Sequence, residues 1–436
     1  MMIAKNQSIL KITLNFLIYF FPLTFVLGNL VTNAVVVLIT ILGFLALLKN
    51  SIKIKFNLII ILTFLFSICI LIVSITNSIN IDKAFLFLRY PLFALIVYNL
   101  FLNFEFNKNK IILFYSLIIL IVSLDIMIQY FFGYNITGFK PPEFGANYVA
   151  YTGFFKDEKI AGSFILTFCF FLIYSFFNNL KFNKNKELFI EIIVWNLIAF
   201  SILFSLNRMS FFLFLFGSIL SVIFLKKKLK SFFVSIIFFL SLLYLLDDDF
   251  IKGRYGGFFD NLKTMLPTIS KHQVELSQKK NSEETELKTI KSGHAYVFSS
   301  AIKVWKNNIY FGVGIKNYVN NCTKVKNSLC STHPHNYYLD IATSGGTVSL
   351  IIIFIIVILI IKEITKIILK NKNKNMDLSF LYSLVICFII IFFPIRSSGG
   401  FFTTSNASYN FFILSLLISE IDRIKILYFF GGRDKN

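Results

Sequence analysis

Long runs of apolar residues, separated by short polar segments, recur along almost the whole chain. As an α-helix, a run of roughly 20 such residues is long enough to cross the hydrocarbon core of a membrane. Helices of a soluble domain instead keep a polar face toward water. The pattern therefore predicts an all-α, polytopic membrane protein with about twelve transmembrane helices and one large extramembrane loop. The expected spans cover residues 12–30, 31–48, 57–76, 84–103, 111–133, 161–178, 188–206, 209–225, 231–246, 347–361, 378–395 and 406–419.

The basic residues set the expected orientation of these spans. The chain carries a formal net charge of +21, and its Lys and Arg residues gather in alternate connections and in the C-terminal tail. Connections rich in Lys and Arg stay in the cytoplasm. We therefore expect both termini in the cytoplasm, a small external loop at 134–160 and a large one at 247–346. Charge placed in this way serves topology and attraction to anionic lipids, so it does not indicate a nucleic-acid partner.

This topology divides the chain into three parts. Residues 1–246 hold the spans that precede the large loop, residues 247–346 form that loop, and residues 347–436 hold the remaining spans and a cytoplasmic tail. The large loop contains all four histidines of the chain, so it is the place to look for chemistry.

Two cysteines of the large loop form a candidate disulfide. Only seven residues separate Cys322 from Cys330, and an external compartment permits their oxidation. Free thiols and metal ligands remain alternatives. A zinc site that adds His333 and His335 has suitable ligand types, but its spacing matches no common zinc template. The acidic run at 247–249 is either a divalent-metal site or a solvated helix end.

Arginine is rare in this chain, which makes its positions informative. Only six of the 43 basic residues are Arg, and four of the six fall at or near the external face. A guanidinium at a membrane interface is costly unless it meets a partner. It can donate a planar pair of hydrogen bonds to phosphate, so a lipid diphosphate would satisfy several at once. Alternatively, each one snorkels or pairs singly with Asp or a headgroup. The four are Arg89, Arg208, Arg254 and Arg396.

A polar segment just before the span at 347–361 places imidazole at the membrane surface. His335 can act as a general base, because imidazole exchanges protons near neutral pH. His333 and Asn336 would support it, and Gly345 and Gly346 permit a tight turn into the helix. Beside a bound diphosphate, this base could activate a hydroxyl that displaces the lipid diphosphate from a sugar carbon. The alternative is that both histidines merely cap the following helix.

Several stretches in chain order carry a resemblance to a known family. They are Leu124-Asp125, Gln129 to Asn135, Thr152 to Phe155, Asn207 to Ser210, Gly293-His294, Phe311 to Gly314, Cys330 to Gly346 and Phe393 to Gly399. In these stretches the chain resembles the O-antigen ligase and polymerase family of bacterial envelope proteins. The resemblance covers most of the chain from residue 111 onward, whereas the earlier spans match only in hydropathy.

The resemblance implies a membrane-embedded, inverting glycosyltransferase that needs no metal or other cofactor. Such enzymes transfer a glycan from undecaprenyl diphosphate to an acceptor hydroxyl on the periplasmic side. The family's loop histidine, the Asn that follows it and the Gly-rich helix start fall on His335, Asn336 and Gly346. A Gly expected three residues after Gly346 is Ser349 here, which weakens the match at the helix start. The family's arginine at the start of a periplasm-facing span falls on Arg208.

A second family arginine is expected inside the large loop, and Arg254 is its only candidate. Arg254 lies far along the chain from His335. The role could instead belong to Lys303, Lys306 or His294.

These features together predict an O-antigen ligase of the bacterial inner membrane, which transfers polysaccharide from undecaprenyl diphosphate to lipid A core. An O-antigen polymerase or a protein O-oligosaccharyltransferase would use the same donor. A transporter of the lipid-linked glycan is a further alternative, although it should show broken spans in matched halves. We expect a monomer whose partners are the lipid-linked donor, a saccharide acceptor and membrane lipids.

Overall fold

The computed structural model describes residues 2–49, 52–104, 106–143, 149–173, 184–224, 229–246, 293–371, 376–397 and 399–430. These residues are mainly α-helical, and the β structure among them is one isolated bridge between Glu143 and Val149. The predicted all-α class is therefore confirmed. The elements are α1 (Met2–Tyr19), α2 (Phe21–Leu27), α3 (Asn29–Leu48), α4 (Leu58–Thr76), α5 (Ile81–Phe87), α6 (Arg89–Asn103), α7 (Lys108–Phe132), η1 (Gly153–Phe155), α8 (Ala161–Phe171), α10 (Lys184–Phe204), α11 (Arg208–Phe224), α12 (Leu229–Leu246), α16 (Gly293–Asn307), α17 (Tyr318–Cys322), α18 (Tyr337–Asn371), α19 (Ser379–Ile391) and α20 (Thr404–Phe430).

Many of these helices can cross a membrane. Within the described residues, seven are long and apolar enough to do so, and the bent pair α1–α2 brings the number to eight. The shorter apolar helices α8, α11 and α19 lie on three further predicted spans. The protein is thus a multi-pass membrane protein with about seven to eight clear spans. The full count of about twelve stays a prediction.

Helix α4 shows how the sequence pattern suits a lipid environment. One face exposes apolar side chains three or four residues apart, whereas the opposite face buries small polar ones such as Thr63, Ser67 and Ser74. A helix between lipid and protein places its small polar residues against other helices, where they pack closely and form hydrogen bonds. The exposed residues are Ile61, Leu65, Ile68, Ile72 and Ile75.

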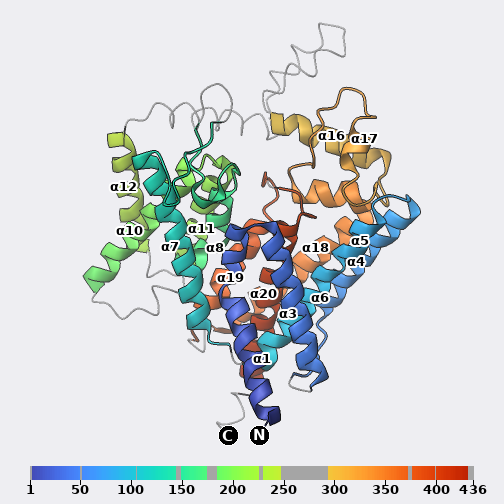
Figure 1. Ribbon diagram of the computed structural model, residues 1–436, viewed down its shortest axis with the longest axis horizontal. Coiled ribbons are helices and arrows are strands. Elements are labelled where there is room, and N and C mark those ends of the chain that lie inside the picture. Colours follow the sequence, from blue (N-terminus) through green and yellow to red (C-terminus); the bar gives the residue numbers. More distant parts are fainter. Residues whose placement is uncertain are drawn as a thin grey trace.

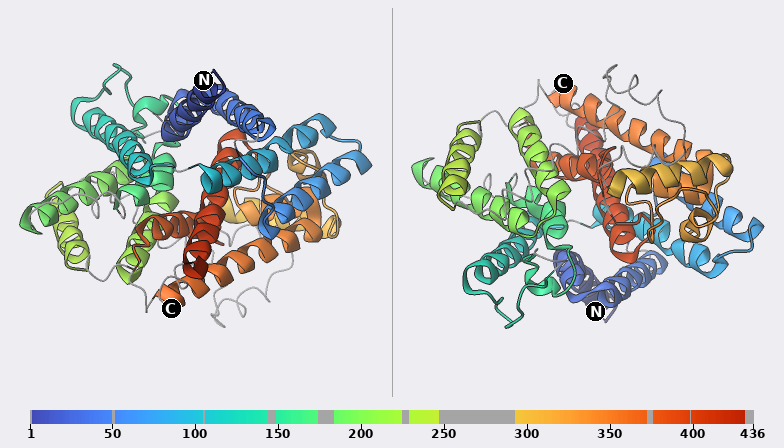
Figure 2. Two further views of the ribbon diagram at one scale, coloured as in Figure 1. Left: turned by 90° about the horizontal axis from the view of Figure 1, so that it is seen from below. Right: turned by 90° about the horizontal axis from the view of Figure 1, so that it is seen from above.

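Helix α20 forms the centre of the molecule. Its residues 407–421 are all buried, so no face of this stretch is left for lipid. Figure 2 shows α20 in the middle, with α7, α8, α10, α11 and α12 on one side and α3 to α6 with α18 on the other. The helices thus form two flanks that meet at α19 and α20 (Figure 1).

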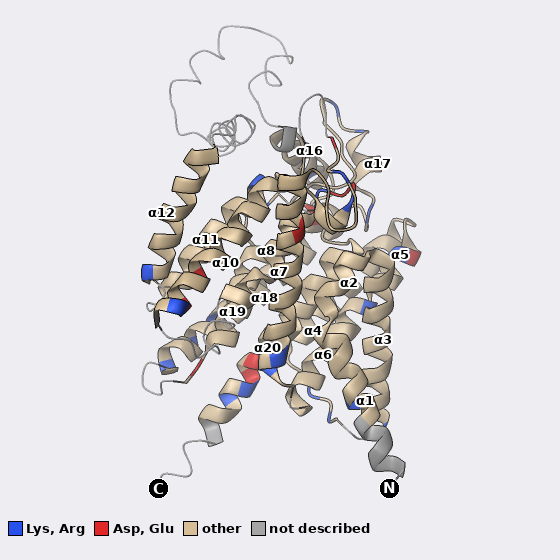
Figure 3. Cartoon of the chain, turned by 60° about the vertical axis from the view of Figure 1, so that its left-hand side comes forward, with Lys and Arg blue, Asp and Glu red and all other residues tan. Residues whose placement is uncertain are grey.

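The two ends of the molecule carry different helices and different charged residues. Helix α1 begins and α20 ends at the bottom of Figure 1, whereas α16 and α17 cover the top. Near the lower end, Glu420 pairs with Lys108 and Arg423, and Lys425 bridges Glu363 and Asp422. Between the ends, charged residues are sparse along the helices (Figure 3). The segments expected to carry the site lie at the end that holds α16 and α17.

Candidate active site

Helix α18 is broken at Gly346, and this break shapes the site. Gly346 has φ 66° and ψ −167°, a conformation that is essentially restricted to glycine. A break leaves carbonyls before it and N–H groups after it without partners inside the helix. Segment 309–314 supplies those partners. The bonds run from Val313 N to Thr343 O (2.8 Å), Gly314 N to Ser344 O (3.0 Å), Thr347 N to Ile309 O (2.8 Å) and Val348 N to Tyr310 O (3.3 Å).

The break separates a short leading helix, residues 337–345, from the long remainder of α18. Segment 309–314 approaches so closely that a Cβ added to Gly312 would lie 2.6 Å from the Gly346 nitrogen. The leading helix is therefore fixed to the part of the chain that follows α16. The predicted tight turn at Gly345 and Gly346 is present, and its partner segment is the stretch that contains the Phe311 to Gly314 turn.

The histidine segment precedes the leading helix directly. The rings of His333 and His335 lie 4.2 Å apart, centroid to centroid. The Nδ1 atom of His333 lies 2.9 Å from the Thr332 hydroxyl. His335 has φ 56°, a left-handed conformation that is uncommon outside glycine, although His adopts it more often than most residues. The two imidazoles thus form one unit at the start of α18.

Asn336 connects this unit to a distant part of the chain. Its side-chain oxygen accepts the Leu339 N–H (3.2 Å), as a residue that caps a helix start does. Its amide nitrogen donates to the carbonyls of Pro394 (2.8 Å) and Arg396 (3.2 Å). Asn336 is buried. The position of His335 is therefore set jointly by the leading helix and by the loop that follows α19.

The Arg396 carbonyl accepts a hydrogen bond from Asn336, and the Arg396 guanidinium contacts groups inside the protein. The side chain is 7% exposed, Nη1 donates to the Ile390 carbonyl at the end of α19 (3.3 Å), and the group lies 5.4 Å from the Tyr337 ring centroid. A cation that donates to the last carbonyls of a helix stabilises that helix end. These contacts indicate that Arg396 stabilises the end of α19.

Arg208 is the first residue of α11, as predicted from the resemblance. Helix α11 packs against the end of α19 through Phe212, whose ring centroid lies 6.0 Å from that of Phe393. Asn207, just before Arg208, donates to the Lys159 carbonyl (3.1 Å). Arg208 thus begins a helix at the same end of the protein as the 394–396 loop and the histidines.

Arg89 opens α6 on the other flank. Its Nη2 donates to the Tyr90 hydroxyl (2.8 Å), and its guanidinium lies 4.6 Å from the Tyr90 ring centroid. The Nε atom is buried and has no partner within the described part of the chain. Arg89 therefore keeps hydrogen-bonding capacity that the protein itself does not use.

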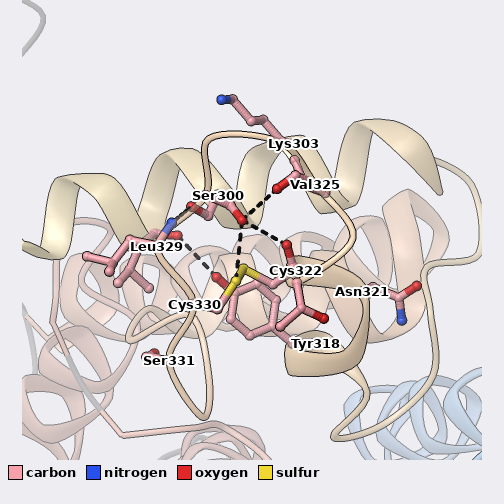
Figure 4. The surroundings of a disulfide bond; sticks show 12 residues. Ser300, Lys303, Tyr318, Asn321, Cys322, Val325, Leu329, Cys330 and Ser331 are labelled. Carbon is pink, nitrogen blue, oxygen red and sulfur yellow. Dashed lines mark hydrogen bonds between the residues drawn. A yellow bond between two sulfur atoms is a disulfide. The ribbon is translucent and has the colours of Figure 1, made fainter. Parts of the chain in front are cut away.

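Cys322 and Cys330 form a disulfide, with their Cα atoms 5.8 Å apart (Figure 4). The bond joins the end of α17 to the segment that leads to the histidines. Ser300 of α16 accepts the Leu329 N–H (2.9 Å), which fixes the same segment to a second helix. Because both sulfurs are bonded to one another, neither offers zinc a thiolate, and the described residues contain no cluster of three metal-ligating side chains.

Some predicted site residues lie outside the described residues. Arg254 and the acidic run at 247–249 are among them, and the side chain of His294 is not described either. Of the two lysine alternatives, Lys303 donates to the Asn327 carbonyl (3.3 Å) and lies on α16 with Lys306.

Two functional candidates were missed from the sequence. Asp340 of the leading helix is 6% exposed and accepts the Phe401 N–H (2.7 Å). A Cβ added to Gly400 would lie 3.3 Å from Asp340 Oδ2 and 3.5 Å from His333 Cβ, so Gly400 separates these two side chains. The second candidate is Lys316, which directly follows the segment docked on the break. In the sequence, Lys316 stands two residues after Gly314, the last residue of the Phe311 to Gly314 stretch.

One comparison with known proteins gives a match. Residues 193–354 match the family model described as O-antigen ligase. The matched stretch runs from α10 into α18 and contains Arg208, both neighbouring histidines and the disulfide, whereas Arg89 and Arg396 lie outside it. No curated protein matches the chain.

Proposed function

We propose that this chain is an O-antigen ligase-type transferase that moves a polysaccharide from undecaprenyl diphosphate to lipid A core, and the family match at residues 193–354 supports the transferase class. The transfer would be inverting and independent of a metal. One observation supports this more than any other: Asn336 holds the His335 segment against the loop after α19, and α11 with Arg208 packs on the same helix end.

In this proposal His335 is the catalytic base. It takes the proton from the acceptor hydroxyl while the hydroxyl oxygen attacks the anomeric carbon of the donor sugar. The bond between that carbon and the diphosphate oxygen breaks, and undecaprenyl diphosphate leaves with the electron pair. Attack opposite the leaving group inverts the anomeric configuration. His333 would support His335 through their ring contact.

Guanidinium groups would stabilise the charge that grows on the leaving diphosphate. Arg208 is the first candidate, because it opens α11, which packs near Phe393, beside the loop that Asn336 contacts. Arg89 has an unused buried Nε, whereas the buried guanidinium of Arg396 acts mainly on α19. Arg254 remains a proposed contact from the large loop.

The proposed setting is the bacterial inner membrane. About twelve spans, both termini in the cytoplasm and a periplasmic loop at 247–346 would place the histidine unit at the periplasmic surface. Residues 1–246 and 347–436 would then form the membrane part around it, in a monomeric enzyme. A membrane-impermeant thiol reagent tests this orientation: it should label Ser277→Cys in spheroplasts, and labelling only after permeabilisation would contradict it.

A transfer assay tests the catalytic role. The purified protein is mixed with a labelled undecaprenyl-diphosphate glycan and lipid A core, and the glycosidic product is quantified. Replacing His335 by Ala should lower the rate by about 100-fold or more, because the acceptor loses its base. His272→Ala removes a histidine of the same loop and should keep the wild-type rate. Equal rates for His335→Ala and the wild type would reject His335 as the base.

The same assay separates an enzyme from a transporter, since a transporter forms no glycosidic bond. A deletion strain separates ligase from polymerase. Loss of a ligase leaves long chains on undecaprenyl diphosphate, whereas loss of a polymerase leaves single repeats on the acceptor. Accumulation of single repeats would favour the polymerase alternative over our proposal.

A further inference from the structure

Three basic residues lie on segments that meet where segment 309–314 ends and α5 begins, and the charges of Lys83 and Arg89 both act on Lys316. Lys316 follows Ile315, Lys83 lies on α5, and Arg89 opens α6. None of the three belongs to the stretch that bears the histidines. Arg89 was predicted as a diphosphate contact, but nothing in the sequence connected it with Lys83 or Lys316.

Hydrogen bonds fix this arrangement. The Ile315 N–H donates to the Ser74 hydroxyl (3.3 Å), and the Ile315 carbonyl accepts from the Asn80 amide (3.0 Å). Asn80 in turn accepts a hydrogen bond from the Lys83 ammonium (2.9 Å). The Lys83 ammonium and the backbone next to Lys316 are therefore joined through one side chain.

Ion pairs within the described residues leave the positive charge at this place unneutralised. Among the described residues, no ion pair within 4.0 Å includes Lys83, Arg89 or Lys316. The pKa of Lys316 is lowered, first by partial desolvation and then by the positive charges of Lys83 and Arg89, while Asp340 acts in the opposite direction. Like charges close to one another disfavour the charged forms, and a bound anion would relieve this repulsion.

Asp340 cannot balance three cations. It carries one negative charge at most, and its Oδ2 already accepts the Phe401 N–H (2.7 Å). The positive charge suits an anionic ligand such as a diphosphate ester, whose oxygens can accept hydrogen bonds from several cations. The buried, unpartnered Nε of Arg89 is a further donor that such a ligand could satisfy.

The cationic group and the histidine unit lie along the same leading helix. Segment 309–314 bonds to Thr343 and Ser344 near its end, and His335 directly precedes its start. Asp340, which interacts with Lys316, lies five residues beyond His335, or about 7.5 Å of helix rise. A sugar linked to a diphosphate can span a separation of this order.

We propose that Lys316, together with Lys83 and Arg89, binds the diphosphate of the lipid-linked donor, and that Lys316 is the loop cation expected to contact it. The identity of the donor rests on the proposed function. Lys316 is exposed, so its ammonium can meet a head group. Lys303 is a weaker candidate, because its ammonium donates to the Asn327 carbonyl.

Binding to the full-length protein in lipid nanodiscs tests the proposal. Farnesyl diphosphate is the probe for the donor diphosphate, and titration calorimetry gives its Kd. Lys316→Gln should weaken binding by about tenfold or more, because a charge-assisted contact is lost. Lys316→Arg should restore binding. Lys324→Gln is the matched control, since it removes an exposed lysine of the same loop.

Two results would overturn the proposal. One is that Lys316→Gln binds farnesyl diphosphate as tightly as the wild type and Lys324→Gln. The other is that Lys316→Gln weakens binding of lipid A, which also carries phosphate, while farnesyl diphosphate binds normally; the cations would then serve the acceptor. The binding assay involves no glycosyl transfer. A wild-type protein that binds farnesyl diphosphate through Lys316 and yet forms no glycosidic bond would contradict the proposed function alone.

Discussion

His335 is held in its left-handed backbone conformation by the residues on either side of it. Pro334 is buried, and Asn336 is fixed by three hydrogen bonds to the leading helix and to the 394–396 loop. Such a conformation costs free energy, so it persists only where the surroundings determine it. The backbone that carries the imidazole is therefore held by the Asn336 side chain, whose hydrogen bonds do not involve the ring.

Lys316 gives the binding site a predicted pH dependence. Its pKa is lowered in the free protein, and a bound diphosphate would raise it again by stabilising the ammonium. The lysine then takes up a proton on binding, so affinity should fall as the pH rises through the window that begins at the lowered pKa. The Kd for farnesyl diphosphate, measured as the pH is raised toward the ordinary pKa of lysine, reports this effect.

Lys316→Arg is the control for this prediction, because a guanidinium stays charged over the same range. Its affinity should decline less steeply than that of the wild type. Parallel pH profiles for the two proteins would show that Lys316 does not titrate on binding.

Among single residues, the sequence predicted the disulfide but not the role of Lys316. Cys322 and Cys330 are close in the chain, and an external loop permits their oxidation, so their disulfide could be foreseen. Lys316 could not, since it is one of 43 basic residues and its neighbours Lys83 and Arg89 are remote in sequence. Only the docking of Ile315 on Ser74 and Asn80 brings them together.

Among the elements, α18 and segment 309–314 depend on one another. The break at Gly346 exposes backbone groups that segment 309–314 satisfies, and the same bonds place Lys316 beside the leading helix. Neither part would be stable in this form alone, because unpaired backbone groups are costly when buried. These backbone bonds thus connect the leading helix, which follows the histidine unit, to the segment that precedes Lys316.

A pair of glycine variants tests this dependence. Gly346→Ala should destabilise the protein by ~3 kcal/mol or more, because its φ is strained and the new Cβ would lie 2.1 Å from the Tyr310 carbonyl oxygen. Gly133→Ala also meets a positive φ of 77°, but nothing lies within 4 Å of its Cβ. It should cost only ~1–2 kcal/mol. Thermal unfolding in one detergent compares the two, and equal losses of stability would contradict the role given to segment 309–314.

Hydropathy predicted where the helices lie but not how each is used. The runs at 57–76 and 111–133 became α4 and α7 almost at their expected bounds. The run at 406–419 became part of α20, whose buried stretch meets protein on every side and therefore tolerates Asn410 and Ser415. The docking of segment 309–314 could not be predicted from hydropathy, because its partners are backbone groups freed by a break elsewhere in the chain.

At the scale of the whole molecule, the site lies where the two flanks meet. Arg208 comes from the flank of α7, α8, α10, α11 and α12, whereas Lys83 and Arg89 come from the flank of α3 to α6. The histidine unit and the 394–396 loop lie between them, above α19 and α20. A lipid-linked donor held between the flanks would have its diphosphate near cations from both and its sugar near His335.

A structure of the full-length protein with an unreactive lipid-linked diphosphate donor tests this arrangement most directly. We expect the diphosphate to lie within hydrogen-bonding reach of Lys316 and of Arg208 or Arg89, with the anomeric carbon facing His335. A diphosphate bound near Glu420 at the opposite end, or one that touches none of these cations, would contradict it.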